Sequence, residues 1–244
     1  MHVVFRESHG LEETETPTDL GQSPADLVVL SFSDSDLGAF AAGWHRAKAA
    51  GETPGLRLAN LAALKHPLSV DVYVEQTLAG AKGILIRLIG GAPYWSYGLQ
   101  SVAALARDKG IALAVLPADG RPDDRLDEIS TLPVSTLRRL SHLCDTGGVV
   151  AAQAALQQLA LASGLYARPV AGAKALPLVG AWSDDTGVTC PAAASLAIGP
   201  KRLVLIAFYR AYLSAADLGP VEALSKALRK RGYTPLGLFA PSLK

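Results

Sequence analysis

The sequence contains little cysteine and almost no net charge. Its 244 residues include two cysteines, Cys144 and Cys190, which are too few for the disulfide framework of a small secreted domain. Neither belongs to a CxxC pair or to a Cys and His zinc spacing, so we interpret both as reduced, partly buried thiols. Lysine and arginine total 23 against 22 aspartate and glutamate residues, a formal net charge of +1. That charge creates no field to hold nucleic acid, which we therefore do not expect as a partner.

Long apolar runs are also missing. No run reaches the about 20 residues that a membrane-spanning helix needs. The longest candidate, residues 149–165, is interrupted by Gln153, Gln157 and Gln158. The first seven residues carry acidic and basic side chains where a signal peptide requires an apolar core. We therefore expect a cytoplasmic protein that does not contact a membrane.

Apolar residues are nevertheless abundant. They make up 50% of the chain and charged residues 18%, a balance that excludes an intrinsically disordered protein. A chain of this length buries roughly 70–75% of the surface that it exposes when unfolded, so it needs neither a disulfide nor a metal to hold its core. One large domain or two small ones are both compatible with this length.

Short apolar runs alternate with segments of helical periodicity in residues 1–122. The predicted strands are residues 27–32, 56–61, 83–89 and 111–116, and the predicted helices lie between them. A nearly continuous apolar run such as 27–32 is typical of a parallel strand covered by helices on both faces. The pattern predicts an α/β fold with a doubly wound, mostly parallel sheet.

The pattern changes after residue 122, and four regions result. Residues 1–122 form the predicted N-terminal α/β domain, 123–166 a helical segment, 167–200 an irregular connector, and 201–244 the truncated start of a second α/β domain. In that last region the predicted strands 203–208 and 236–240 flank a helix. One βαβ unit is marginally stable alone, so we expect the remainder of its domain to lie elsewhere.

Candidate site residues occur where the predicted parallel strands end, because doubly wound proteins bind ligands there. The polar loops at those positions are 33–36, 90–98, 119–121, and 209–210 with Asp217. The loop 33–36 could present two carboxylates, Asp34 and Asp36, to a cation or a polar ligand. The Ser-x-x-Asp spacing of Ser33 and Asp36 is, however, that of a helix cap. We favour the capping interpretation.

The candidate binding loop consists of Gly90, Gly91, Tyr94, Trp95 and Tyr97. Tyrosine and tryptophan could stack on a flat, largely apolar ligand. The alternative is a helix N-terminus packed by these aromatic side chains. The glycines match neither GxGxxG nor GxxxxGK[ST], so they predict no nucleotide site. The five histidines are scattered, and the chain has no HExxH or GxSxG motif; we identify no catalytic residue and no metal ligand.

Several stretches, taken together and in order, resemble one family, the large subunit of aerobic cobaltochelatase (CobN), which is related to the H subunit of magnesium chelatase. They are residues 26–37, 56–61, 66–71, 87–91 with 94–98, 110–117 with 119–120, 208–210 and 239–244. Individually most are weak, but as a set they are specific. They extend from residue 26 to the end, with gaps mainly in 123–200.

The resemblance implies the N-terminal portion of a subunit that binds hydrogenobyrinic acid a,c-diamide and receives Co(II) in cobalamin biosynthesis. Separate AAA+ subunits are implied to hydrolyse ATP and drive the insertion. The family's metal-insertion residues lie beyond residue 244, so this portion is expected to bind no cofactor and to be inactive alone; cobalt(II) and ATP serve the complete complex. Residues 90–97 would then face the tetrapyrrole or a domain interface. The alternative function is a self-contained α/β module that binds a small ligand or a protein without catalysis.

Overall fold

Five parallel strands in the order β1-β3-β2-β4-β5 form the first sheet of the computed structural model, which describes residues 2–4, 16–168, 170, 175–198 and 202–242. The strands are β1 (His2–Val4), β2 (Leu27–Ser31), β3 (Leu56–Asn60), β4 (Gly83–Leu88) and β5 (Ala112–Pro117). In the central pair, Leu27 lies opposite Gly83 and Ser31 opposite Arg87. This sheet confirms the predicted parallel α/β architecture.

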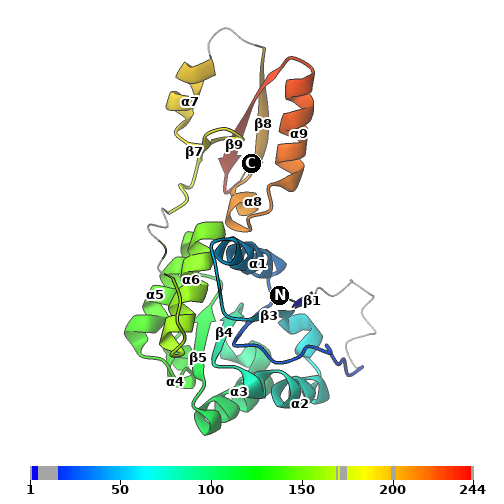
Figure 1. Cartoon of the computed structure of the whole chain (residues 1–244), viewed down its shortest axis with the longest axis vertical. Helices are drawn as coiled ribbons and strands as arrows, with labels where there is room; N and C mark the ends of the chain where they lie inside the picture. The colour runs from blue at the N-terminus through cyan, green and yellow to red at the C-terminus, as the bar shows by residue number, and fades with distance from the viewer. Residues whose placement is uncertain (1, 5–15, 169, 171–174, 199–201, 243–244) are drawn as a thin grey trace.

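Helices cover both faces of the first sheet (Figure 1). One face carries α1 (Asp34–Ala49), α5 (Val134–Thr146) and α6 (Val149–Ala162), and the other carries α2 (Pro67–Gln76) and α3 (Ser96–Lys109). The short helix α4 (Asp124–Ile129) packs beside β5. Val29 of β2 is buried toward α1 and α6, whereas the adjacent Leu30 is buried toward α2 and α3. Alternate side chains therefore enter two cores, which explains the continuous apolar runs of the strands.

Single helical turns complete the connections of the first unit: η2 (Leu61–Leu64), η3 (Leu78–Gly80) and η4 (Ala92–Trp95). The long pair α1 and α6 packs especially closely. A Cβ atom on Gly43 of α1 would lie 2.6 Å from the backbone nitrogen of Gln153 in α6. Only glycine allows the two helices this approach.

The second unit is a four-stranded mixed sheet in the order β7-β6-β9-β8. Its elements are β6 (Gly180–Ser183), β7 (Gly187–Thr189), α7 (Pro191–Ile198), β8 (Leu203–Tyr209), α8 (Arg210–Ser214), α9 (Gly219–Lys230) and β9 (Thr234–Ala240). The strands β8 and β9 are parallel, as the sequence predicted, and β6 is antiparallel to β9 and to β7.

The expectation of an irregular connector at 167–200 was wrong for residues 180–198. Two strands and a helix occupy this region, but the strands have only four and three residues, too few to establish a period of two. Trp182 of β6 is 5% exposed and packs edge-on against Phe208 of β8, with ring centroids 6.4 Å apart. The second unit therefore has its own core.

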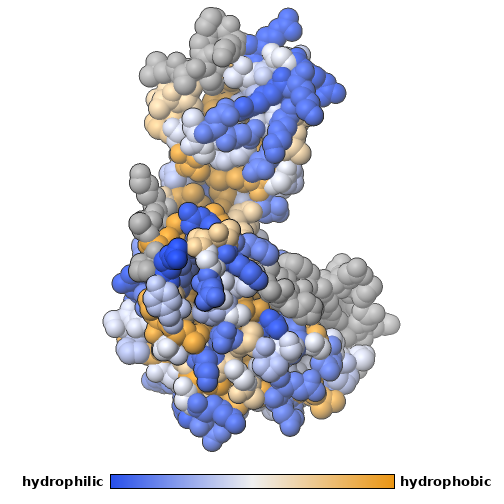
Figure 2. All heavy atoms as spheres, viewed as in Figure 1, coloured by the Kyte–Doolittle hydropathy of each residue, from blue (hydrophilic) through white to orange (hydrophobic). Residues whose placement is uncertain are grey.

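The two units meet where α8 lies beside α1 (Figure 1). The backbone N–H of Gly148, which precedes α6, donates to the carbonyl of Ser214 at 2.9 Å. Apolar residues gather at this neck in the space-filling view (Figure 2), and Leu213 there is 7% exposed. Within the described ranges, no helix has both the length and the apolar character needed to cross a bilayer.

Candidate functional site

The strand order of the first sheet reverses between β2 and β4. From β2 the chain crosses over α1 to β3 on one side, while β4 pairs with the opposite edge of β2. The loops that leave β2 and β4 therefore diverge, and this divergence opens a crevice at the carboxyl ends of the strands. This switch point is the place in the fold where a ligand site is expected.

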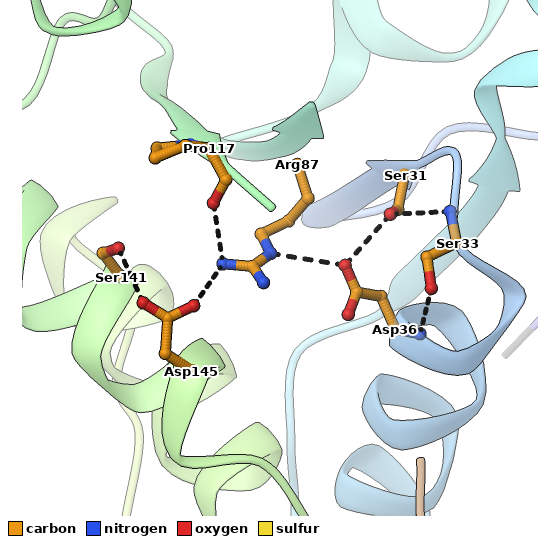
Figure 3. A network of polar contacts seen from close by, with 7 residues as sticks. All are labelled: Ser31, Ser33, Asp36, Arg87, Pro117, Ser141 and Asp145. Atoms are coloured by element: carbon orange, nitrogen blue, oxygen red, sulfur yellow. Dashed lines mark hydrogen bonds and ion pairs between the residues drawn. The ribbon is translucent and has the colours of Figure 1, made fainter. Parts of the chain in front are cut away.

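A buried arginine occupies the switch point. Arg87 is the one charged residue of β4, and its side chain is 4% exposed. Its Nε donates to Asp36 Oδ2 at 3.3 Å, and its Nη1 donates to the Pro117 carbonyl at 3.1 Å and to Asp145 Oδ1 at 3.3 Å (Figure 3). The guanidinium thereby connects β4, α1, α5 and the end of β5.

The carboxylate of Asp36 is itself held by a second donor. Ser31, the last residue of β2, donates from its Oγ to Asp36 Oδ2 at 3.0 Å. Asp36 is about a quarter exposed and Asp145 about half exposed, so Arg87 is the most deeply buried charged residue of the network. Two carboxylates and one backbone carbonyl compensate its charge, as a buried cation requires.

The network also fixes protonation states. Burial acts to lower the pKa of Arg87, but Cys144 when ionised and the Asp36 and Asp145 carboxylates outweigh it and raise that pKa above the ordinary value. Burial raises the pKa of the Cys144 thiol to about 12, although the adjacent Arg87 charge opposes this rise. Arg87 therefore stays charged, and Cys144 stays a protonated, weakly nucleophilic thiol at neutral pH.

The crevice is small and is closed by the second unit. Its cavity of about 270 Å³ is lined by residues that include Asp36, Arg87, Cys144, Asp145, Arg210 and Ser214. Pockets for drug-sized ligands usually measure roughly 300–1,000 Å³. Arg210 of α8 reaches the rim, but its guanidinium donates to the carbonyls of Leu176 and Pro177, both at 3.0 Å. The hydrogen bonds of Arg87 thus stay within the first unit, and α8 of the second unit packs over the crevice.

The structure does not bring all the polar loops at the ends of the predicted strands to one cavity. Ser33 caps α1, with its Oγ accepting from the N–H of Asp36 at 3.3 Å, which confirms the capping interpretation. Asp36 and Arg210 both line the switch-point cavity, whereas residues 90–98 are not among its lining. Sequence reasoning missed Arg87 and Asp145. A charged residue inside the apolar run 83–89 was the available signal.

The candidate loop turns sharply after β4. Gly90 has φ 83° and Gly91 has φ 75°, left-handed values that favour glycine. Trp95 follows at 5% exposure, and its Nε1 donates to the Leu64 carbonyl at 2.8 Å. A Cβ atom on Gly98 would lie 2.1 Å from the Trp95 ring. Trp95 is therefore a packed core residue with its polar atom satisfied.

The two tyrosines of the loop point into different surroundings. Tyr94 is 62% exposed, and its ring meets Phe32 edge-on at a centroid distance of 5.4 Å. Tyr97 is 45% exposed and donates from its hydroxyl to Asp71 Oδ1 at 2.7 Å, a hydrogen bond that raises the pKa of Tyr97. The tyrosines thus offer accessible aromatic surface, but Trp95 does not. A ligand role for this loop stays a prediction.

Comparisons with known proteins give one consistent result. No protein-family model matches the chain. The aerobic cobaltochelatase subunit CobN of a Sinorhizobium species is 35% identical over 254 residues, and that of Pseudomonas aeruginosa is 32% identical over 259 residues. Both alignments include the whole chain, which spans about a fifth of each relative (20% and 19%). The solved catalytic subunit of cobaltochelatase from Mycobacterium tuberculosis matches 90% of this chain with a TM-score of 0.66 at 25% identity, over 16% of its own length.

Proposed function

Because the chain belongs to the CobN family of aerobic cobaltochelatase subunits, we propose that it is the N-terminal portion of the large, corrin-binding subunit of such an enzyme. In this proposal the complete subunit inserts Co(II) into hydrogenobyrinic acid a,c-diamide during cobalamin biosynthesis. The observation that carries the proposal is the 35% identity to CobN along the whole chain. The similar fold of a solved cobaltochelatase subunit supports it.

The reaction needs an energy source, which the proposal places outside this chain. AAA+ partner subunits hydrolyse ATP, and the large subunit uses the resulting conformational work for metal insertion. The sequence agrees with that division, because it contains no GxxxxGK[ST] phosphate-binding motif. Cobalt and ATP thus serve the complete complex, and residues 1–244 alone are inactive.

The crevice at Arg87, which α8 of the second unit covers, suggests what this portion contributes. Its cavity of about 270 Å³ is too small to enclose a tetrapyrrole, and the Asp36 and Asp145 carboxylates already pair with the arginine. We assign the crevice to holding the second α/β unit against the first. The corrin, if it contacts this portion, meets the accessible tyrosines Tyr94 and Tyr97 beside Gly90 and Gly91, whereas Trp95 supports the loop from below.

Reconstitution tests this function. The full-length subunit is mixed with its ATPase subunits, ATP, Co(II) and hydrogenobyrinic acid a,c-diamide, and corrin-bound cobalt is measured by elemental analysis together with the corrin absorption spectrum. We expect cobalt in the corrin only when ATP and all subunits are present. A folded full-length subunit that yields no metallated corrin, or that inserts Mg²⁺ in preference to Co(II), overturns the proposal.

A further inference from the structure

The β8 edge of the second sheet is unpaired within the described part of the chain. The strand β8 pairs with β9 along one edge, and no described strand pairs with its other edge. Three large apolar side chains of β8 are exposed on one face: Leu203 at 47%, Leu205 at 56% and Tyr209 at 46%. An unpaired edge beside exposed leucines favours association with another chain segment.

The opposite face of β8 is largely packed. Ile206 is 9% and Phe208 is 5% exposed, and both belong to the core that includes Val221 of α9. On the bare side, α7 covers the neighbouring strand: its Ala194 packs with Leu236 of β9. The described part of α7 leaves Leu205 exposed. On this face of the sheet, the exposed apolar side chains described above therefore lie on β8, beside its unpaired edge.

The first unit shows how the same arrangement is completed. There, β2 and β3 are a parallel pair joined by α1, just as β8 and β9 are a parallel pair joined by α9. In the first unit β4 takes the second edge of β2, while α2 and α3 cover the face opposite to α1. Every residue of β2 is consequently buried, whereas alternate residues of β8 are exposed. Among the described residues, the second sheet has no counterpart of β4 beside β8 and no helix over the exposed side chains of β8.

We infer that a helix and a parallel strand of the full-length subunit, from outside residues 1–244, complete the second sheet at β8. The strand pairs with the free edge, and the helix covers Leu203, Leu205 and Tyr209. The relatives contain enough further sequence to provide this strand and helix, because the present chain spans only about a fifth of their length. Right-handed crossover geometry places the added helix on the face opposite to α9. The inference depends on membership of a longer subunit and not on metal insertion.

Hydrogen exchange on the unaltered full-length subunit tests the strand pairing. Peptides that cover residues 203–209 report the amides of β8. With both edges paired, nearly all these amides exchange slowly; with one bare edge, about half exchange as fast as exposed loop amides. Fast exchange of half the amides in the full-length subunit contradicts the inference. Because activity is not measured, this outcome is distinct from failure of cobalt insertion.

Thiol labelling and cross-linking identify what covers β8. In the full-length subunit, the Leu205→Cys thiol should react with maleimide at least about fivefold more slowly than the control Lys226→Cys thiol on α9, where the lysine side chain is 66% exposed. A smaller difference contradicts coverage. The photoreactive residue p-benzoylphenylalanine, placed at position 205, should cross-link to a peptide of the same chain from outside residues 1–244. Cross-links to a second copy or to an ATPase subunit would overturn the assignment.

Discussion

Asp36 and Arg87 are 51 positions apart, yet Oδ2 of the aspartate accepts a 3.3 Å hydrogen bond from Nε of the arginine at the switch point of the first sheet. The contact places the negative charge of the first turn of α1 against the cation of β4. It occupies the position where doubly wound proteins usually hold a ligand. The protein thus uses that crevice for internal cohesion.

The two carboxylates beside Arg87 are expected to contribute unequally to the stability of the protein. Asp36→Asn should lower the free energy of unfolding by about 2 kcal/mol, because it leaves the buried guanidinium with one half-exposed carboxylate, Asp145, beside the Pro117 carbonyl. The control, Asp145→Asn, should cost about 0–1 kcal/mol, since Asp145 is 47% exposed. Urea denaturation of residues 1–244 measures both values. Equal costs would show that Asp36 is not the principal partner.

Two glycines of α1 provide a matched pair of substitutions. Gly43→Ala should destabilise the protein by about 1–3 kcal/mol, because the new methyl group would collide with the backbone of α6. Gly38→Ala should be neutral or stabilising by about 0.5–1 kcal/mol, since its Cβ would meet only the Ala215 carbonyl at 3.6 Å. Thermal denaturation followed by circular dichroism compares the two. A Gly43→Ala protein as stable as Gly38→Ala would refute the close helix packing.

The two cysteines should react at very different rates. At pH 8, iodoacetamide should modify the exposed Cys190 readily and Cys144 about a hundredfold more slowly, because burial raises the Cys144 pKa to about 12 and leaves little thiolate. Exposure of Cys190 corrects the expectation that both thiols are partly buried. Mass spectrometry of peptides gives both rates. The raised pKa also predicts that stability falls as the pH rises from about 9 toward 12, because the unfolded chain releases the Cys144 proton first.

Two substitutions in the full-length subunit distinguish a ligand-binding role of the loop after β4 from a structural one. If the loop contacts the corrin, Tyr94→Ala should raise the KM for hydrogenobyrinic acid a,c-diamide about three- to tenfold, the effect of losing one aromatic contact. Trp95→Phe should leave KM unchanged and lower stability by about 1–3 kcal/mol, because the buried Leu64 carbonyl loses its donor. Steady-state kinetics and urea denaturation separate these effects. An unchanged KM in Tyr94→Ala would assign the loop to structure alone.

Most of the fold could be predicted because its strands are buried on both faces. Runs such as 27–32 and 83–89 differ from the observed strands by only one residue at the end. The elements at 180–198 could not be predicted in the same way. Their short strands carry no measurable period. β6 acquires its place by pairing with β9, 55 to 59 residues later in the chain, and β7 by pairing with β6.

The site was harder to predict than the fold. Sequence patterning located the loop at 33–36 and its capping role, because both follow from local spacing. Asp36 pairs with Arg87 of β4, which also pairs with Asp145 of α5, and only the tertiary arrangement brings these three residues together. Trp95 illustrates the opposite error. An aromatic residue beside a glycine turn resembles a stacking platform in sequence, whereas the structure buries its ring in the core.

Cobalt insertion by the full-length subunit carrying Arg87→Met tests the account most directly, with the wild-type subunit measured in parallel and both below their melting temperatures. Our account predicts ATP-dependent insertion by the wild type. In the variant it predicts a lower melting temperature and a KM for hydrogenobyrinic acid a,c-diamide within about twofold of the wild-type value, since a positioning residue does not bind substrate. A KM raised about tenfold at an unchanged melting temperature would show instead that the switch point binds the corrin. The absence of insertion by the folded wild type would contradict the proposed function itself.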